Sequence, residues 1–122
     1  MRRHLGVNLV IVLFLTALVG AAPSSSPVAD AAMRGDRDAV RALLKQGADV
    51  SAAQGDGMTA LHHAAERGDA AMVEMLVYAG ANVGAMTRIG QYTPLHVASQ
   101  SGNAAVVQAL LDRKSTRLNS SH

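Results

Sequence analysis

Apolar residues recur along the middle of the chain at the spacing of short amphipathic helices. After Gly68, a stripe of four apolar residues falls on one side of a helix, namely Met72, Val73, Leu76 and Val77. Similar stripes occur earlier and later, at Val40, Leu43 and Leu44 and at Val106, Val107, Leu110 and Leu111. Before each stripe lies a shorter run whose apolar side is rich in alanine. The pattern predicts an all-α chain made of paired short helices.

These helix pairs repeat along the chain with a period of 33 or 34 residues. The segments that align are 31–35 with 64–68 and 47–50 with 80–83, both offset by 33, and 59–62 with 93–96, offset by 34. A fixed period of this length is typical of stacked repeats, in which each unit buries its apolar face against its neighbours.

The aligned residues resemble the ankyrin repeat, whose signature opens with Thr-Pro-Leu-His-x-Ala, has a glycine between two helices and closes with Gly-Ala-Asp-Val. Thr93-Pro94-Leu95-His96 matches the opening, and Gly47-Ala48-Asp49-Val50 matches the close. The resemblance implies an ankyrin repeat solenoid, in which the signature histidine bonds the signature threonine and the backbone of the neighbouring loop. The residues that would carry this structural motif are Thr59, His62, Gly68, Gly80, Thr93, Pro94, His96 and Gly102.

The three copies differ in ways that indicate their places in the stack. Residues 28–50 lack the Thr-Pro-Leu-His opening and have a polar outer face, which suits an N-terminal capping repeat. Residues 51–83 form a full repeat, and residues 84–111 form a truncated one. The loop 84–92 has one residue more than 51–58, in a place where such repeats put variable binding residues.

Polar residues and glycines predict where the helices start and stop. The hydroxyl of Thr59 can cap the first helix of the second copy. Asp36 and Asp69 follow the turn glycine, where capping of the second helix explains them. Gly68 makes the tight turn between the two helices, where a positive φ is needed. In the first copy the second helix is expected over about 37–46, stopped by Gly47.

The N-terminal segment, residues 1–21, has the pattern of a secretory signal peptide. Residues 1–4 are cationic, Leu9 to Val19 is eleven residues with only Thr16 polar, and small residues follow. Eleven helical residues reach about 16 Å, well short of the roughly 30 Å hydrocarbon core of a bilayer. We therefore expect a signal-peptide helix, cleavage after Ala21, a linker over 22–27, and a bacterial protein that is periplasmic or secreted. Counting from Leu5 to Ala22 lengthens the apolar run, so an uncleaved membrane anchor is the alternative.

The last eleven residues, 112–122, depart from the repeat pattern. They lack the Gly-Ala-Asp-Val close, and the string resembles the translation of a common short-read sequencing adapter. We therefore interpret 112–122 as an adapter-derived artefact, the alternative being a genuine polar, disordered tail. On the first interpretation the repeats are the N-terminal part of a longer exported protein that continues beyond Leu111.

Composition and charge give no support for catalysis, metal binding or nucleic-acid binding. There are no cysteines, and the formal charge of +2 comes from the chain ends. With the five basic residues and one acidic residue of those ends set aside, 22–111 keeps six Lys and Arg against eight Asp and Glu, without a basic stripe. His62 and His63 project to different sides of one helix, so a shared zinc ion is not expected. No phosphate loop, nucleophile elbow or His-Glu-x-x-His motif occurs, and no cofactor is expected.

Ankyrin-like stacks bind proteins through a concave face made of turn tips and first helices, so the resemblance implies a protein-interaction module that is not an enzyme. The partner-binding candidates are Asp56, Met58, His63, Glu66 and Arg67 in the second copy and Arg88, Ile89, Gln91, Tyr92, Val97, Gln100 and Ser101 in the third. Met58, Ile89 and Tyr92 are the sharper choices, because large apolar groups at exposed tips are usual interface anchors. Two alternatives stay open: Ile89 packs beneath its long loop, and His63 is a solvated surface residue.

Other interpretations of function also follow from the sequence. The repeats could recruit a partner to a larger secreted enzyme or toxin whose catalytic region lies downstream, or they could form a membrane-tethered module. With nothing covering the third copy, we expect Val106, Val107, Leu110 and Leu111 to be half exposed and the stack to be marginally stable.

Overall fold

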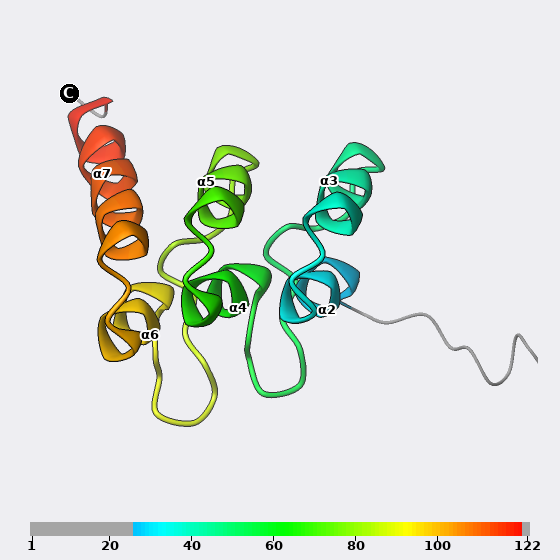
Figure 1. Cartoon of the computed structure of the whole chain (residues 1–122), viewed down its shortest axis with the longest axis horizontal. Coiled ribbons are helices and arrows are strands. Elements are labelled where there is room, and N and C mark those ends of the chain that lie inside the picture. Colours follow the sequence, from blue (N-terminus) through cyan, green and yellow to red (C-terminus); the bar gives the residue numbers. More distant parts are fainter. Residues whose placement is uncertain (1–25, 121–122) are drawn as a thin grey trace, which may run out of the picture.

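The computed structural model describes residues 26–120, and within this range the chain forms six α-helices in three antiparallel pairs (Figure 1). The helices are α2 (Pro27–Met33), α3 (Arg37–Lys45), α4 (Ala60–Arg67), α5 (Ala70–Tyr78), α6 (Pro94–Ser101) and α7 (Ala104–Ser120). No strand occurs in this part of the chain, so the all-α prediction is confirmed. None of the helices between residues 26 and 120 has both the length and the hydrophobicity to cross a membrane. The predicted signal peptide, residues 1–21, lies outside the described residues.

The three pairs stack side by side in chain order (Figure 1). The first helices α2, α4 and α6 form one layer, in which α4 packs against both of its neighbours. The second helices α3, α5 and α7 form the other layer (Figure 1). Residues 46–59 and 79–93 connect successive pairs as long loops that project to the same side of the stack (Figure 1).

The core contains small side chains in the first layer and larger ones between the layers. Alanines that are fully buried in the first layer let α2, α4 and α6 approach closely; they are Ala29, Ala31, Ala32, Ala60, Ala64, Ala65 and Ala98. Leu61 on α4 and Met72 and Leu76 on α5 are the largest fully buried side chains. Burial of each such side chain stabilises the fold by about 1.5–3 kcal/mol relative to exposure.

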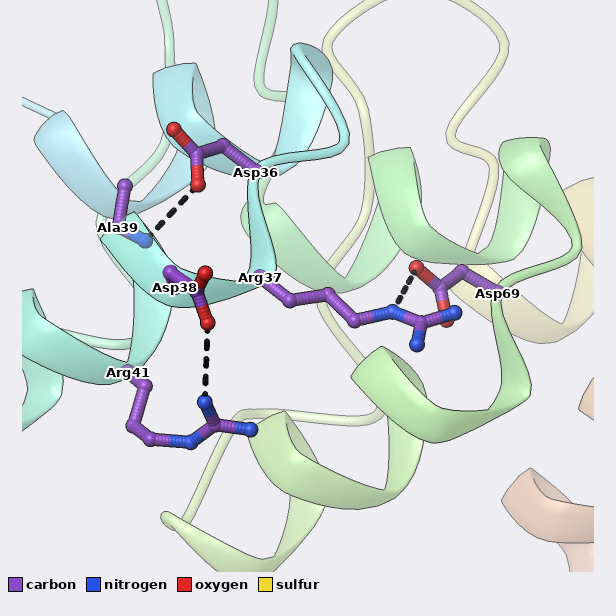
Figure 2. A network of polar contacts seen from close by, with 6 residues as sticks. All are labelled: Asp36, Arg37, Asp38, Ala39, Arg41 and Asp69. Carbon is purple, nitrogen blue, oxygen red and sulfur yellow. Dashed lines mark hydrogen bonds and ion pairs between the residues drawn. The ribbon is translucent and has the colours of Figure 1, made fainter.

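The predicted caps and turn are present at the helix ends. The N–H of Ala39 donates to the Asp36 carboxylate over 3.0 Å at the start of α3 (Figure 2). Asp69 caps α5 in the same way, and Thr59 accepts from the backbone of His62 at the start of α4. Gly68 ends α4 with φ at +71°, the left-handed conformation that favours glycine. These local predictions are confirmed.

The burial of α7 differs from the prediction. Val106 and Leu110 are buried rather than half exposed, because their side of α7 packs against α5 and α6. Leu111 faces away from these helices and is exposed. The prediction of half-exposed side chains is therefore wrong for Val106 and Leu110. It is right for Val107, which is half-buried, and for Leu111.

The length of α7 follows from a missing stop signal. The second helices of the first two copies end just before Gly47 and Gly80, which have φ angles of +84° and +95°. Thirty-four residues after Gly80 the chain has Lys114, so no glycine stops α7 there. The backbone of 112–120 accordingly continues as helix.

Candidate functional site

The loop between α5 and α6 is organised around a buried threonine. The N–H of Thr87 donates to the carbonyl of Tyr92 over 3.0 Å. Its hydroxyl donates to the carbonyl of Ile89 over 2.9 Å and accepts the N–H of Tyr92 over 3.0 Å. Gln91 completes the chain reversal with a φ of +53°, which is uncommon outside glycine. These bonds fix the backbone of the loop and hold Ile89 at its tip.

The preceding loop supports this tip from one side. Met58 donates its N–H to the Asp56 carboxylate and accepts from Gln54 through its carbonyl, both at 2.9 Å. The N–H of Arg88 then donates to the carbonyl of Asp56 over 3.0 Å, which joins the two loop tips. Gly57 lies at this junction, where a Cβ atom would come within 2.9 Å of the Arg88 nitrogen. The two tips therefore form one continuous surface.

Large apolar side chains are exposed on the tip of the loop between α5 and α6, which is called the second tip below. Ile89 is 86% exposed, Met86 is 57% exposed and Tyr92 is 38% exposed. The alternative that Ile89 packs beneath its loop is therefore wrong. Met58, the third sharp candidate, is half-buried. Met86 is not among the candidates predicted from the sequence, although a large apolar residue in a loop otherwise rich in polar residues and glycine was a usable signal.

His62 joins the start of α4 to the second tip. Its Nδ1 accepts the N–H of Thr59 over 3.1 Å and lies 2.9 Å from the Thr59 hydroxyl, while Nε2 lies 2.8 Å from the Tyr92 carbonyl oxygen. Because a carbonyl only accepts, these partners assign the proton to Nε2 and make the ring neutral. Burial lowers the pKa of His62, and it outweighs the hydrogen bond to Tyr92 and the attraction of Asp56. The predicted tie from threonine through histidine to the neighbouring loop is confirmed here.

His96 occupies the same signature position in the third copy but lies in different surroundings. Its backbone N–H donates to the Thr93 hydroxyl over 3.2 Å, as the motif predicts. Its imidazole is exposed and lies against the ring of Tyr92, with ring centroids 4.6 Å apart. Among residues 26–120 no long loop follows α7 to accept from this ring, so the predicted inter-repeat bond of His96 is absent from that part of the chain.

His63, for which a solvated surface position was left open, lies in the interior. It is only 8% exposed, and its Nε2 lies 2.7 Å from Oε1 of Gln54. Gln54 in turn donates to the Asp30 carboxylate on α2 over 2.7 Å. Burial lowers the pKa of His63, although Glu66, Asp56 and Asp30 act in the opposite direction. The solvated interpretation is wrong, because this polar chain links α2, the first long loop and α4.

The remaining candidates lie at or near the surface. Arg67 is exposed but has a structural bond, because its guanidinium donates to the carbonyl of Met33 over 3.0 Å at the end of α2. In the same way the side-chain amide of Asn103 donates to the carbonyl of Ala65, near the end of α4, over 3.2 Å. Val97 is half-buried. The other candidates are exposed, namely Asp56, Glu66, Arg88, Gln91, Gln100 and Ser101.

The described residues offer no arrangement for metal chemistry. Over residues 26–112, no group of three or more His, Asp or Glu side chains is placed to hold a metal ion. The polar side chains instead cap helices or bond neighbouring repeats. The exposed feature that stands out among these residues is the pair of joined loop tips.

Comparison with known proteins agrees with the repeat pattern. The family model described as ankyrin repeats (3 copies) matches residues 28–121. A search of curated proteins finds no match.

Proposed function

Because the chain belongs to the ankyrin repeat family, we propose that it binds a protein partner through the tip surface, defined as Asp56, Met86, Arg88, Ile89 and Tyr92. Ankyrin repeats are protein-interaction modules and are generally non-catalytic. The family therefore gives the kind of function, and the exposed residues of this chain give the surface.

The observation that carries the proposal is the exposure of Ile89 on a fixed loop. An isoleucine that is 86% exposed contributes nothing to the core of its own chain. The hydrogen bonds of Thr87 hold its backbone in place, so a partner does not have to order the loop on binding. Preorganised apolar side chains of this kind are common interface anchors.

The charges beside Ile89 favour a partner with matching polar groups. Arg88 and Asp56 are exposed at the junction of the two tips and flank the apolar side chains. A polar rim around an apolar centre is the usual arrangement of a protein interface. The other exposed candidates, Glu66, Arg67, Gln91, Gln100 and Ser101, would extend this rim along the first helices.

Site-specific photo-crosslinking tests the surface directly. A photoreactive amino acid replaces Ile89 in one variant and Tyr78 in a control, because Tyr78 is 83% exposed on α5 in the other layer. We expect a discrete protein adduct from position 89 and none from position 78. Ile89→Asp should then weaken binding of that protein by at least about tenfold, as truncation of a typical anchor does. Adducts of equal yield at both positions, or none at 89, would contradict the proposal.

We further propose that the repeats act after export. The support is the pattern of residues 1–21, with a cationic start, a short apolar run and small residues at its end. Expression of the whole chain in a bacterium should give a product in the periplasm or medium whose N-terminus is Ala22. Leu13→Arg, which places a charge in the apolar run, should abolish cleavage. An intact N-terminus on a membrane-bound product would favour the anchor, and an intact cytoplasmic product would contradict export.

A further inference from the structure

The imidazole of His62 links α4 to the loop between α5 and α6 through one hydrogen bond at each ring nitrogen. Only the neutral ring can make both bonds, because one nitrogen accepts and the other donates. On one side Nδ1 accepts the backbone N–H of Thr59 over 3.1 Å. On the other side Nε2 donates to the carbonyl of Tyr92 over 2.8 Å. The Tyr92 carbonyl also accepts the N–H of Thr87 within the loop. The Nε2 bond therefore connects α4 to the hydrogen-bonded loop around Thr87.

Protonation of the ring conflicts with this geometry. A second proton would sit on Nδ1 and point at the N–H of Thr59, so two donors would face each other. The Thr59 hydroxyl could turn to accept from Nδ1, but the backbone N–H would still lose its acceptor. Thr59 is only 3% exposed, so water does not readily replace that acceptor. If the charged ring turns out toward water, the bond to Tyr92 is lost as well.

The groups around His62 that would favour a charged ring are outweighed by its burial. Asp56 in the preceding loop is the carboxylate that faces it, and His63 is its titratable neighbour on α4. The loop before α6 directs the carbonyls of Tyr92 and Ala85 at it. Asp30 on α2 bonds to Gln54 and acts on His63. On α5 and α6 the titratable groups are exposed, namely Glu74, Tyr78 and His96.

The third copy provides an internal comparison. His96 stands at the same signature position but is exposed, and its ring rests against Tyr92. Its ring is not enclosed between a buried N–H and a loop carbonyl, so the conflict is specific to the buried His62.

We propose that His62 is a pH-sensitive joint that holds the tip surface in place when the ring is neutral and releases it when the ring is protonated. This regulation rests on the proposed function of that surface. Once the ring is protonated, the loop around Thr87 would separate from α4, and the preorganisation of Ile89 and Tyr92 would be lost. Partner binding would then be tight at neutral pH and weak in acid.

Amide hydrogen exchange of the whole chain, without a partner, tests the joint. Protection factors, corrected for the intrinsic pH dependence of exchange, are measured from about pH 7.5 downward, past the ordinary histidine pKa and through the titration of His62. Protection of Thr59, Arg88 and Tyr92 should fall by about tenfold, as expected for a lost buried hydrogen bond. Val73 and Leu76, in the core of α5, serve as reference amides and should change less. NMR titration of each imidazole shows which histidine the change follows.

Two matched variants isolate the residue responsible. His62→Gln cannot titrate and should abolish the pH dependence, whereas His96→Gln changes the same signature position and should leave it as in the unmodified chain. If His62→Gln does not fold, the unmodified protein still decides, because the loss of protection must follow the titration of His62. The proposal would be overturned if the loss of amide protection followed the titration of His63. It would also be overturned if protection did not change while His62 titrated.

Crosslinking from position 89 at neutral pH separates this proposal from the function on which it rests. An adduct with unchanged loop protection in acid would support the tip surface and overturn the joint. Loop protection that falls in acid without any adduct at neutral pH would overturn the tip surface and support the joint as a conformational device.

Discussion

Arg37 on α3 binds the carboxylate of Asp69, the residue that starts α5 in the next helix pair (Figure 2). The Nε atom of Arg37 lies 2.9 Å from Oδ2, and its second guanidinium nitrogen lies 2.8 Å from Oδ1. The same carboxylate caps α5 by accepting the N–H of Met72 over 3.1 Å. One largely buried side chain therefore starts a helix and joins two repeats.

Substitutions of Asp69 should separate these two roles. Asp69→Ala loses both the cap and the ion pair, and we expect it to destabilise the fold by about 1–2 kcal/mol, the usual cost of losing an N-cap. Asp69→Asn keeps an acceptor for Met72 and should cost less. Denaturant unfolding measures both. Asp38→Asn is the control, because Asp38 pairs with Arg41 at the exposed surface of α3 and should change stability little. Equal effects of Asp69→Ala and Asp38→Asn would contradict this account.

The pH dependence of Asp69 follows from the same contacts. Burial alone would raise its pKa, but the hydrogen bonds from Arg37 and from Met72 outweigh burial and lower it below the ordinary 3.8. A carboxylate with a lowered folded-state pKa stabilises the fold fully above its unfolded value, and this contribution is lost as pH falls through the folded value. The stability difference between the unmodified chain and Asp69→Asn should therefore be constant above pH 3.8 and shrink below it. Denaturation at a series of pH values tests this, and a difference that grows in acid would refute it.

His63 should make the stack sensitive to milder acid. Burial lowers its pKa below the ordinary 6.5, so the unfolded chain takes up the proton first and stability falls as pH drops below 6.5. His63→Leu removes this contribution, and Val97 at the corresponding position of the third copy indicates that an apolar side chain fits. We expect the variant to lose some stability at neutral pH, because Gln54 loses a hydrogen-bond partner. Its stability should nevertheless depend less on pH than that of the unmodified chain. Denaturant unfolding of both chains at a series of pH values measures the difference, and equal pH dependence would contradict this account.

The parts of the fold that the sequence predicted well are those decided by near neighbours. Thr59, Gly68 and Asp69 act on backbone groups within three or four residues, so the repeat period and the rules for helix ends were sufficient. The exposure of Ile89 is different, because its position in the longer loop left two alternatives open and only the structure shows that the side chain is exposed.

The parts that the sequence did not predict depend on partners in other repeats. Arg37 and Asp69 are 32 residues apart, and the second copy has Ala70 where the first has Arg37, so the period gave no sign of the ion pair. His63 was expected at the surface because its position varies between copies, yet Gln54 from the preceding loop satisfies it in the interior. Such contacts depend on how loops lie across the stack, which periodicity does not encode.

Two glycines in equivalent turns provide a test of how repeats are coupled. Gly68 and Gly102 have φ angles of +71° and +72°, so a side chain at either position costs about 1–2 kcal/mol or more in backbone strain, most for a β-branched residue. Their surroundings differ, because a Cβ atom at Gly68 would lie 2.7 Å from the amide oxygen of Asn103, whereas Gly102 has nothing within 4 Å.

Gly68→Val should therefore destabilise the stack more than Gly102→Val. It adds the displacement of Asn103, whose amide donates to the carbonyl of Ala65 over 3.2 Å, at a further cost of about 1 kcal/mol. Thermal and denaturant unfolding measure the difference, and we expect Gly68→Val to unfold the described repeats as one cooperative unit. In an Asn103→Ala background the extra cost should disappear, so that the two glycine variants become alike. A gap that persists without Asn103 would show that the second turn is coupled to the third repeat by some other contact.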